Sequence, residues 1–263
     1  MIYLKSEEEI ELIRNSSLLV GKTLAEVATY LKPGIQTMVL DKIAEEYIRD
    51  NQGIPGFKNY NGYPATLCIS VNDQIVHGIP GKKEIKDGDI VSIDCGAILN
   101  KFNGDSAYTF AVGDVKPEIM ELLKRTKESL DKGIEMAVAG NRIGDIGYAV
   151  QRYVEGFGYS VVRELVGHGL GKHLHEEPQV PNYGRRGSGH KLTEGMVICI
   201  EPMINLGKKE IIQERDGWTI RTKDGQPSAH YEHVVSVLRN QSEVLSTFAF
   251  IENIKNDNLK TIN

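Results

Sequence analysis

The sequence predicts an α/β protein built from two similar halves, and three observations carry this prediction. Amphipathic stretches with apolar residues at helical spacing alternate with short apolar runs that are typical of strands. Several features of the first half recur 106 or 107 residues later. The length of 263 residues allows one large domain or two small ones, each with its own core.

The N-terminal part of the chain predicts two helices. Ser6-x-x-Glu9 matches a capping box, and apolar residues follow at helical spacing until Lys32-Pro33-Gly34. A second helix is expected from about Thr37 and ends by Gly53.

Strand patterns follow, and then two more helices. A short β-like run covers Thr66 to Val71, and two longer strands are expected at about Asp89–Ala97 and Phe102–Ala111. Further helices are expected at about Pro117–Val138 and Ile143–Phe157.

Three pairs of features occur in the same order in both halves: a glycine before a helix, an acid-glycine pair that opens a strand ending in an acid, and His-x-x-Pro. The pairs are Gly34 and Gly140, Asp87-Gly88 and Glu194-Gly195, and His77-Gly78-Ile79-Pro80 and His175-Glu176-Glu177-Pro178. We therefore expect an internal duplication, with halves at about 32–112 and 138–238 that share one core and face each other across a binding cleft.

Composition excludes several classes of protein. With 31 Lys and Arg against 36 Asp and Glu, the net charge is −5, which argues against nucleic acid or an anionic membrane as the main partner. No stretch approaches 18 apolar residues, and no signal-peptide pattern follows Met1, so we expect a cytoplasmic protein that does not span a membrane. The cysteines form no C-x-x-C pair and are expected to be reduced and buried in strands; they are Cys68, Cys95 and Cys199.

Carboxylates at the ends of apolar strands predict a metal site. Asp94 lies in an apolar strand, where an unpaired acid is costly to bury. A hairpin that turns at Leu99–Asn100 would place Asp94 directly opposite Asp105, and the two would repel unless a cation lay between them. The alternative is a bulge that sends Asp105 to solvent.

The second half adds two carboxylates and an imidazole. Glu201 ends an apolar strand, Glu232 begins another, and His168 lies between two glycines. This oxygen-rich set suits Mn²⁺, Fe²⁺ or Co²⁺ better than a structural thiolate zinc, although Zn²⁺ is allowed. Four buried acids without a counter-charge would each cost several kcal/mol, which favours a metal site. Four negative charges balance two divalent ions, and a site with a single ion is the alternative.

From about Ser6 to Val237, the chain resembles the bacterial type I methionine aminopeptidases of peptidase family M24, which have the pita-bread fold. The resemblance rests on V-H-G-I-P, S-I-D, G-D-S, G-H-G-L-G, H-E-E-P, I-E-P-M and Y-E-H, which contain His77, Asp94, Asp105, His168, His175, Glu201 and Glu232. It implies one catalytic domain over residues 1–263, with two pseudo-symmetric α/β halves and a largely antiparallel sheet around a dinuclear metal cleft.

The resemblance also implies an activity: hydrolytic removal of the initiator methionine from nascent chains and peptides, with a preference for a small second residue. The implied metal ligands, for two ions of Co²⁺, Mn²⁺, Fe²⁺ or Zn²⁺, are Asp94, Asp105, His168, Glu201 and Glu232. A hydroxide bridging the ions would attack the scissile carbonyl, with Glu201 as general acid and base. His175 would stabilise the oxyanion, and His77 would hold the substrate amide or assist proton transfer.

The methionine side chain would bind among aromatic residues and a thiol, since aromatic rings and sulfur make favourable contacts with a thioether. The residues implied are Tyr60, Tyr63, Cys68 and Trp218, with Phe57 and Leu174 beside them. Packing in the core or in a loop is the alternative for Trp218 and the tyrosines. The sequence departs from the family pattern at Phe57, Leu174 and His230.

Further expectations concern ions, partners and the remaining histidines. A monovalent cation, Na⁺ or K⁺, is implied near Asn72, Gln74 and Ser228. We expect a monomer, in which the basic pairs Lys82-Lys83 and Arg185-Arg186 are either solvated or in transient contact with the ribosome. Surface or packing positions are expected for His173, His190, His230 and His233.

Two rival functions fit the same fold. A proline dipeptidase or Xaa-Pro aminopeptidase would carry a large N-terminal domain, whereas only one helix precedes the first half here. A catalytically inactive binding protein would usually lose metal ligands, and this chain retains all five.

Overall fold

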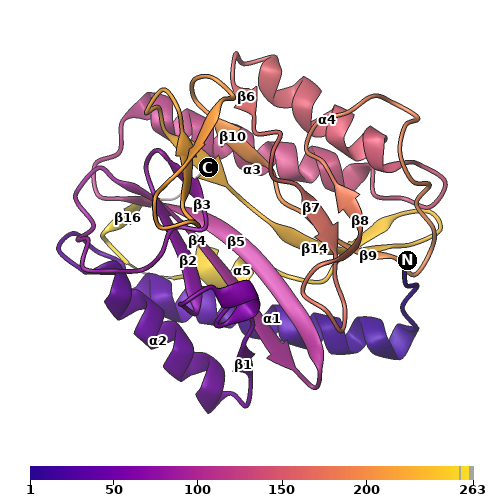
Figure 1. Ribbon diagram of the computed structural model, residues 1–263, viewed down its shortest axis with the longest axis horizontal. Helices are drawn as coiled ribbons and strands as arrows, with labels where there is room; N and C mark the ends of the chain where they lie inside the picture. Colours follow the sequence, from indigo (N-terminus) through magenta and orange to yellow (C-terminus); the bar gives the residue numbers. More distant parts are fainter. Residues whose placement is uncertain (255, 261–263) are drawn as a thin grey trace.

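Antiparallel sheets form the middle of the molecule and helices lie along two of its edges (Figure 1). The computed structural model describes residues 1–254 and 256–260. The helices are α1 (Glu7–Tyr30), α2 (Thr37–Asp50), α3 (Pro117–Glu135), α4 (Ile143–Glu155), the short α5 (Ala249–Glu252) and the 3₁₀ turn η1 (Tyr60–Gly62). Helix α1 packs on β4 and β5, while α3 packs on β9, β10 and β13. Within the described residues, no helix combines the length and apolarity needed to cross a membrane.

The first large sheet holds the hairpin that carries the two aspartates. Its strands are β1 (Ile54–Pro55), β4 (Ile90–Leu99), β5 (Phe102–Val112) and β16 (Leu259–Lys260) in that order, with β2 (Leu67–Val71) also paired to β4. Every residue of β5 is buried, because α1 packs on this strand and the start of β14 lies beside it.

The second large sheet holds the remaining carboxylates and the histidine. Its order is β15 (Ser242–Val244), β14 (His233–Val237), β9 (Val197–Ile200), β7 (Gly167–Gly169) and β8 (Glu176–Val180). Two small sheets complete the fold: β13 (Ser228–His230), β10 (Met203–Asn205) and β6 (Ser160–Val161), and β11 (Ile211–Gln213), β12 (Ile220–Thr222) and β3 (Gln74–Val76).

The two large sheets repeat one arrangement of strands. The order β2-β4-β5 in the first sheet matches β7-β9-β14 in the second. Gly88 before β4 and Gly195 before β9 have φ of +86° and +88°, in the left-handed region that glycine tolerates best. Backbone hydrogen bonding joins the two sheets, because the Glu232 amide donates to the Ala107 carbonyl at 2.9 Å. The shared strand order and the glycines before β4 and β9 are what an internal duplication predicts.

The sequence signals for the helices are borne out. The Ser6 hydroxyl accepts a hydrogen bond from the Glu9 amide, and the Glu9 carboxylate accepts one from the Ser6 amide, both at 3.2 Å. This capping box satisfies two donors at the start of α1. The three cysteines are free and buried in β2, β4 and β9, as the sequence predicts.

The predicted register of the hairpin was wrong by two residues. Asp94 pairs with Ala107, and Asp105 pairs with Gly96. The turn is formed by Asn100 and Lys101, whose φ values of 51° and 70° are those of a tight two-residue hairpin turn. Because side chains alternate with a period of two, the shift leaves both aspartates on the same face. The alternative, Asp105 in solvent, is also wrong, since its exposure is 3%.

The contact between α1 and β5 allows no side chain at Gly104. A Cβ built there would lie 2.3 Å from the backbone of Ser16 and of Ser17. We expect Gly104→Ala to lower the free energy of unfolding by about 1–3 kcal/mol, as overpacking does. Urea denaturation measures the change. Gly81→Ala is the matched control, because the nearest atom to its built Cβ lies 4.0 Å away; equal stability of the two variants would contradict the prediction.

Candidate active site

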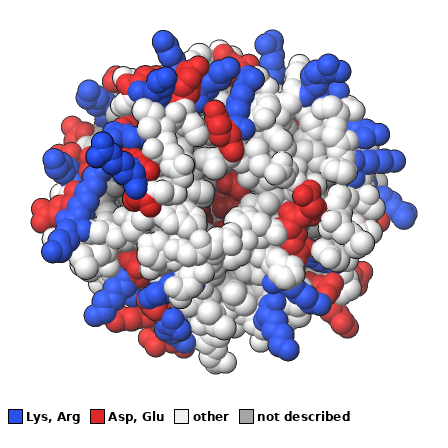
Figure 2. Space-filling model, viewed as in Figure 1, with Lys and Arg blue, Asp and Glu red and all other residues white. Residues whose placement is uncertain are grey.

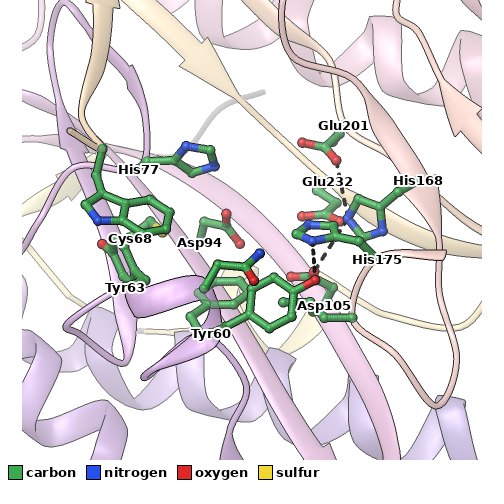
Figure 3. Close-up of a pocket in the computed structure, with 14 residues that line it drawn as sticks. Tyr60, Tyr63, Cys68, His77, Asp94, Asp105, His168, His175, Glu201 and Glu232 are labelled. Atoms are coloured by element: carbon green, nitrogen blue, oxygen red, sulfur yellow. Dashed lines mark hydrogen bonds and ion pairs between the residues drawn. The ribbon is translucent and has the colours of Figure 1, made fainter. Parts of the chain in front are cut away.

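One cavity of about 130 Å³ gathers every residue that the sequence assigns to the site (Figure 3). Figure 2 shows carboxylates on the floor of a hollow in the middle of this face. The lining residues are Phe57, Tyr60, Asn61, Tyr63, Cys68, His77, Asp94, Asp105, His168, Leu174, His175, Glu201, Trp218 and Glu232. Asn61, in the turn η1, is the one member that was not predicted.

The two sheets supply the polar side of the cavity jointly. Asp94 and Asp105 come from β4 and β5, His168 from β7, Glu201 from the residue after β9, and Glu232 from the residue before β14. The His168 Nε2 atom lies 3.6 Å from Glu201 Oε1 and 3.9 Å from Asp105 Oδ2. These five side chains therefore converge on one small volume.

Several buried acceptor atoms in this cluster have no hydrogen-bond partner among the described residues. They are Asp94 Oδ1, Asp105 Oδ1 and Glu232 Oε1. Buried polar atoms are rarely left unpaired, because each unpaired group costs about 1–3 kcal/mol. Unpartnered carboxylate oxygens that face one another fit the ligands of a divalent cation.

The imidazole of His168 is set up as a metal ligand. Its Nδ1 lies 2.9 Å from the Gly169 carbonyl oxygen, which only accepts hydrogen bonds. The proton therefore lies on Nδ1, and the lone pair of Nε2 is free for a metal. Burial lowers the pKa of His168 to about 3, so the ring is neutral and able to coordinate.

Burial raises the pKa of all four carboxyl groups, and neighbouring carboxylates add to the shift at Asp94, Asp105 and Glu232. Burial raises the pKa of Asp94 to about 7 and that of Glu201 to about 8. The pKa of Asp105 and that of Glu232 lie well above the ordinary value, first through burial and then through the neighbouring carboxylates. A cation that displaces these protons relieves both effects, so the donor set fits divalent ions.

A thiol also lies in this cluster, although its position was not predicted. Cys199 Sγ and one ligand atom each of Asp105, His168 and Glu232 all lie within 4.8 Å of one another. Burial raises the pKa of Cys199 well above its ordinary value, so the group is a thiol. Strand alternation was the available signal, since Cys199 precedes Glu201 by two residues and shares its face of the strand.

Two histidines line the cavity beside the carboxylates. The Nδ1 of His175 lies 2.9 Å from the Tyr60 hydroxyl, and its ring packs edge-on against His168 with centroids 4.3 Å apart. His77 has a left-handed backbone with φ of 58°, which is uncommon outside glycine and clusters at functional sites. Burial lowers the pKa of His77 to about 4, so this ring is neutral.

The opposite side of the cavity is aromatic (Figure 3). Tyr63 and Trp218 meet edge-to-face with ring centroids 5.1 Å apart, and the Tyr63 hydroxyl lies 3.0 Å from the Leu67 and Gly78 carbonyl oxygens. Cys68 belongs to the same cluster. These fixed rings leave a polarisable apolar wall facing the carboxylates.

The remaining histidines occupy different environments. His173 and His190 are exposed, whereas His233 is buried, stacks on Phe248 and hydrogen bonds the Ser246 hydroxyl at 2.6 Å. His230 is buried as well, but its Nε2 lies 3.5 Å from Glu201 Oε2. The sequence did not indicate this closeness to the site.

A cleft between two antiparallel sheets, with buried carboxylates and a coordinating imidazole on its floor, defines a metal-dependent hydrolase. Comparison with known proteins agrees. The model of metallopeptidase family M24 matches residues 11–239, and the chain belongs to this family. The use of divalent metal follows from the family and from the residue cluster.

Relatives and solved structures give the same classification. A methionine aminopeptidase of Clostridium perfringens is 52% identical, over 94% of this chain and 99% of the relative. The crystal structure of methionine aminopeptidase from Rickettsia prowazekii matches with a TM-score of 0.92 and 39% identity, over 94% of this chain and all of that one. A prolidase from Pyrococcus furiosus, 23% identical with a TM-score of 0.75, shares the fold over 93% of this chain and 65% of its own length.

The raised carboxyl pKa values make metal binding pH-dependent. Without metal, the carboxyl groups of the folded protein keep their protons at pH values where those of the unfolded chain, with a pKa near 4, have lost them. The stabilisation of the folded state by these bound protons is therefore complete below about pH 4. It is lost as the pH rises through about 7 for Asp94 and 8 for Glu201. We therefore expect bound metal to raise the melting temperature more at pH 8 than at pH 6.

Thermal unfolding of chelated and metal-loaded protein across this pH range measures the effect. Glu201→Gln should make the melting temperature of the metal-free protein less dependent on pH, because it removes one carboxyl group with a raised pKa. A metal-induced stabilisation of the same size at both pH values would contradict the prediction.

Proposed function

We propose that this chain is a methionyl aminopeptidase, which hydrolyses the peptide bond after an N-terminal methionine and prefers a small second residue. One observation carries the proposal: a wall of fixed aromatic rings faces a cluster of five potential metal ligands within a single cavity. The names of the relatives and the family membership support it.

The metal ligands we propose are the five cluster residues Asp94, Asp105, His168, Glu201 and Glu232. Two ions are favoured, because four carboxylates carry the charge that two divalent cations balance, and Co²⁺, Mn²⁺, Fe²⁺ and Zn²⁺ all suit these donors. When bound, the ions supply Lewis acidity toward the substrate carbonyl and lower the pKa of a water molecule.

Glu201 is the proposed general base and acid. In the metal-free protein, burial raises the pKa of its carboxyl group to about 8, so the group holds a proton at neutral pH. A group of this kind takes a proton from the attacking water and returns it to the leaving amine.

The two cavity histidines are proposed to act as neutral donors. His175 can donate from Nε2 only if Nδ1 is an acceptor, and the Tyr60 hydroxyl 2.9 Å away is placed to donate to that atom. Tyr60 then fixes the tautomer in which His175 stabilises the developing oxyanion. His77, 6.4 Å from the Trp218 ring between centroids, is placed near the aromatic wall to hold the substrate amide or assist proton transfer.

The methionine side chain is proposed to lie against Tyr63, Cys68 and Trp218. Phe57 and Leu174 are buried in the same hydrophobic cluster and close the pocket from behind. Aromatic rings and a thiol contact a thioether favourably, with each sulfur–aromatic contact worth about 0.3–1.5 kcal/mol.

The proposal also covers the wider setting of the activity. We propose a cytoplasmic monomer acting on nascent chains, a location supported by three unpaired cysteines. A monovalent cation is proposed near Asn72, Gln74 and Ser228, where the Ser228 amide donates to the Asn72 carbonyl at 3.0 Å. The basic pairs Lys82-Lys83 and Arg185-Arg186 are the proposed ribosome contacts.

The activity can be tested with short peptides. Metal-loaded protein should release methionine from Met-Ala and Met-Gly peptides, and a chelator should abolish the release. Glu201→Gln should lower kcat by a factor of about 10²–10⁴, because it removes the general base. Glu194→Gln is the matched control, since Glu194 is exposed and 3.8 Å from Arg239 at the surface. The absence of release with all four metals would favour an inactive binding protein.

The methionine pocket makes a separate prediction. Trp218→Ala should raise KM for a Met-Ala peptide about tenfold, equivalent to about 1.4 kcal/mol, with a smaller effect on kcat, because it removes binding present in both ground and transition states. Ile212→Ala is the control, since Ile212 lies on the neighbouring strand β11 and is 44% exposed. Steady-state kinetics of Trp218→Ala measures both parameters, and a drop in kcat at constant KM would argue against this pocket.

A further inference from the structure

His230 lies at the edge of the site in a firmly held position. It is the last residue of β13, and its side chain is buried, with 1% exposure. Its backbone amide donates to the Thr109 hydroxyl at 2.9 Å, and its carbonyl oxygen accepts from the same hydroxyl at 2.7 Å. These contacts tie β13 to β5 and hold the backbone of His230 in place, while burial restricts its side chain.

The carboxylate of Glu201 lies between two imidazoles, each facing a different oxygen. Oε1 is 3.6 Å from Nε2 of His168, whereas Oε2 is 3.5 Å from Nε2 of His230. The Nε2 of His168 has no proton, because the proton is held at Nδ1 by the Gly169 carbonyl. The two oxygens of Glu201 therefore have different surroundings.

The Nε2 of His230 is buried and has no hydrogen-bond partner within the described part of the chain. An ionised carboxylate only accepts hydrogen bonds, so a ring nitrogen that faces it is favourable only when it carries the proton. A distance of 3.5 Å is slightly longer than the usual 2.7–3.2 Å of an N–H···O bond, and hydrogen bonds of this kind tighten when an active site is loaded.

We propose that His230 is a positioning residue: its Nε2–H holds Oε2 of Glu201 and leaves Oε1 for the metal beside His168. One oxygen of Glu201 then accepts a hydrogen bond while the other is left for the metal, and the carboxylate cannot rotate freely. This inference rests on the proposed role of Glu201. It also gives a partner to a buried ring nitrogen that has none among the described residues.

The test compares His230→Leu with His230→Gln. Leucine fills similar space without a donor, whereas the amide of glutamine can donate to the same oxygen. Loss of a hydrogen bond to a ligating carboxylate typically lowers metal affinity or activity about 10- to 100-fold. We expect His230→Leu to show losses of this size in Mn²⁺ affinity, measured by titration calorimetry, and in kcat, with KM for a Met-Ala peptide little changed. His230→Gln should recover most of both.

Three controls separate positioning from other roles. His233→Gln alters a buried imidazole that does not face Glu201 and should retain Mn²⁺ affinity. In a Glu201→Gln background, His230→Leu should have little further effect on affinity, because coupled residues are not additive. The visible spectrum of the Co²⁺ form should be the same for wild type and His230→Gln if the imidazole is not itself a ligand.

Each contrary outcome overturns the inference. Wild-type affinity and kcat in His230→Leu would show that the contact has no role, and failure of His230→Gln to recover affinity would exclude hydrogen-bond donation. A changed Co²⁺ spectrum in His230→Gln would make His230 a metal ligand. If wild-type protein released no methionine, the proposed function would fail, whereas the affinity comparison would still decide the role of His230.

Discussion

The repulsion among four buried carboxyl groups is the constraint on which the site depends. Asp94, Asp105, Glu201 and Glu232 each have a raised pKa, and three of them present oxygen atoms that have no hydrogen-bond partner among the described residues. Such a cluster would move apart if it lay on flexible loops. Here it is held by strands of two sheets, and the sheets are joined beside the cluster by the hydrogen bond from the Glu232 amide to β5.

The cavity combines two chemical environments, and a hydrogen bond links them. Carboxylates and His168 form one wall, while Tyr63 and Cys68 lie on the other (Figure 3), where the ring of Trp218 packs against Tyr63. The Tyr60 hydroxyl reaches from the aromatic side to Nδ1 of His175. In the proposed mechanism, recognition of an apolar side chain is thereby coupled to the handling of protons, since Tyr60 lines the cavity and its hydroxyl also lies 2.9 Å from His175 Nδ1.

Much of the fold and site could be predicted because the signals are local or strongly patterned. The capping box at Ser6 and the apolar strands ending in acids depend on neighbouring residues alone. The hairpin register could not be predicted with the same accuracy, because Asn100 and Lys101 adopt positive φ without a glycine in the turn. The closeness of His230 to Glu201 depends on how β13 docks against β5, which is a contact between distant segments and leaves no periodic trace in the sequence.

Behind the aromatic side of the cavity, Gly96 of β4 leaves room for the ring of Phe57, which lines the cavity. A Cβ at Gly96 would lie 2.5 Å from the ring of Phe57, so any larger residue at this point of β4 would push that ring toward the cavity. If this cavity binds the substrate side chain as we propose, the size it accepts depends on two positions, Phe57 on the wall and Gly96 on the sheet beneath it. Volume exchanged between these two positions would then change specificity without moving any of the five proposed metal ligands.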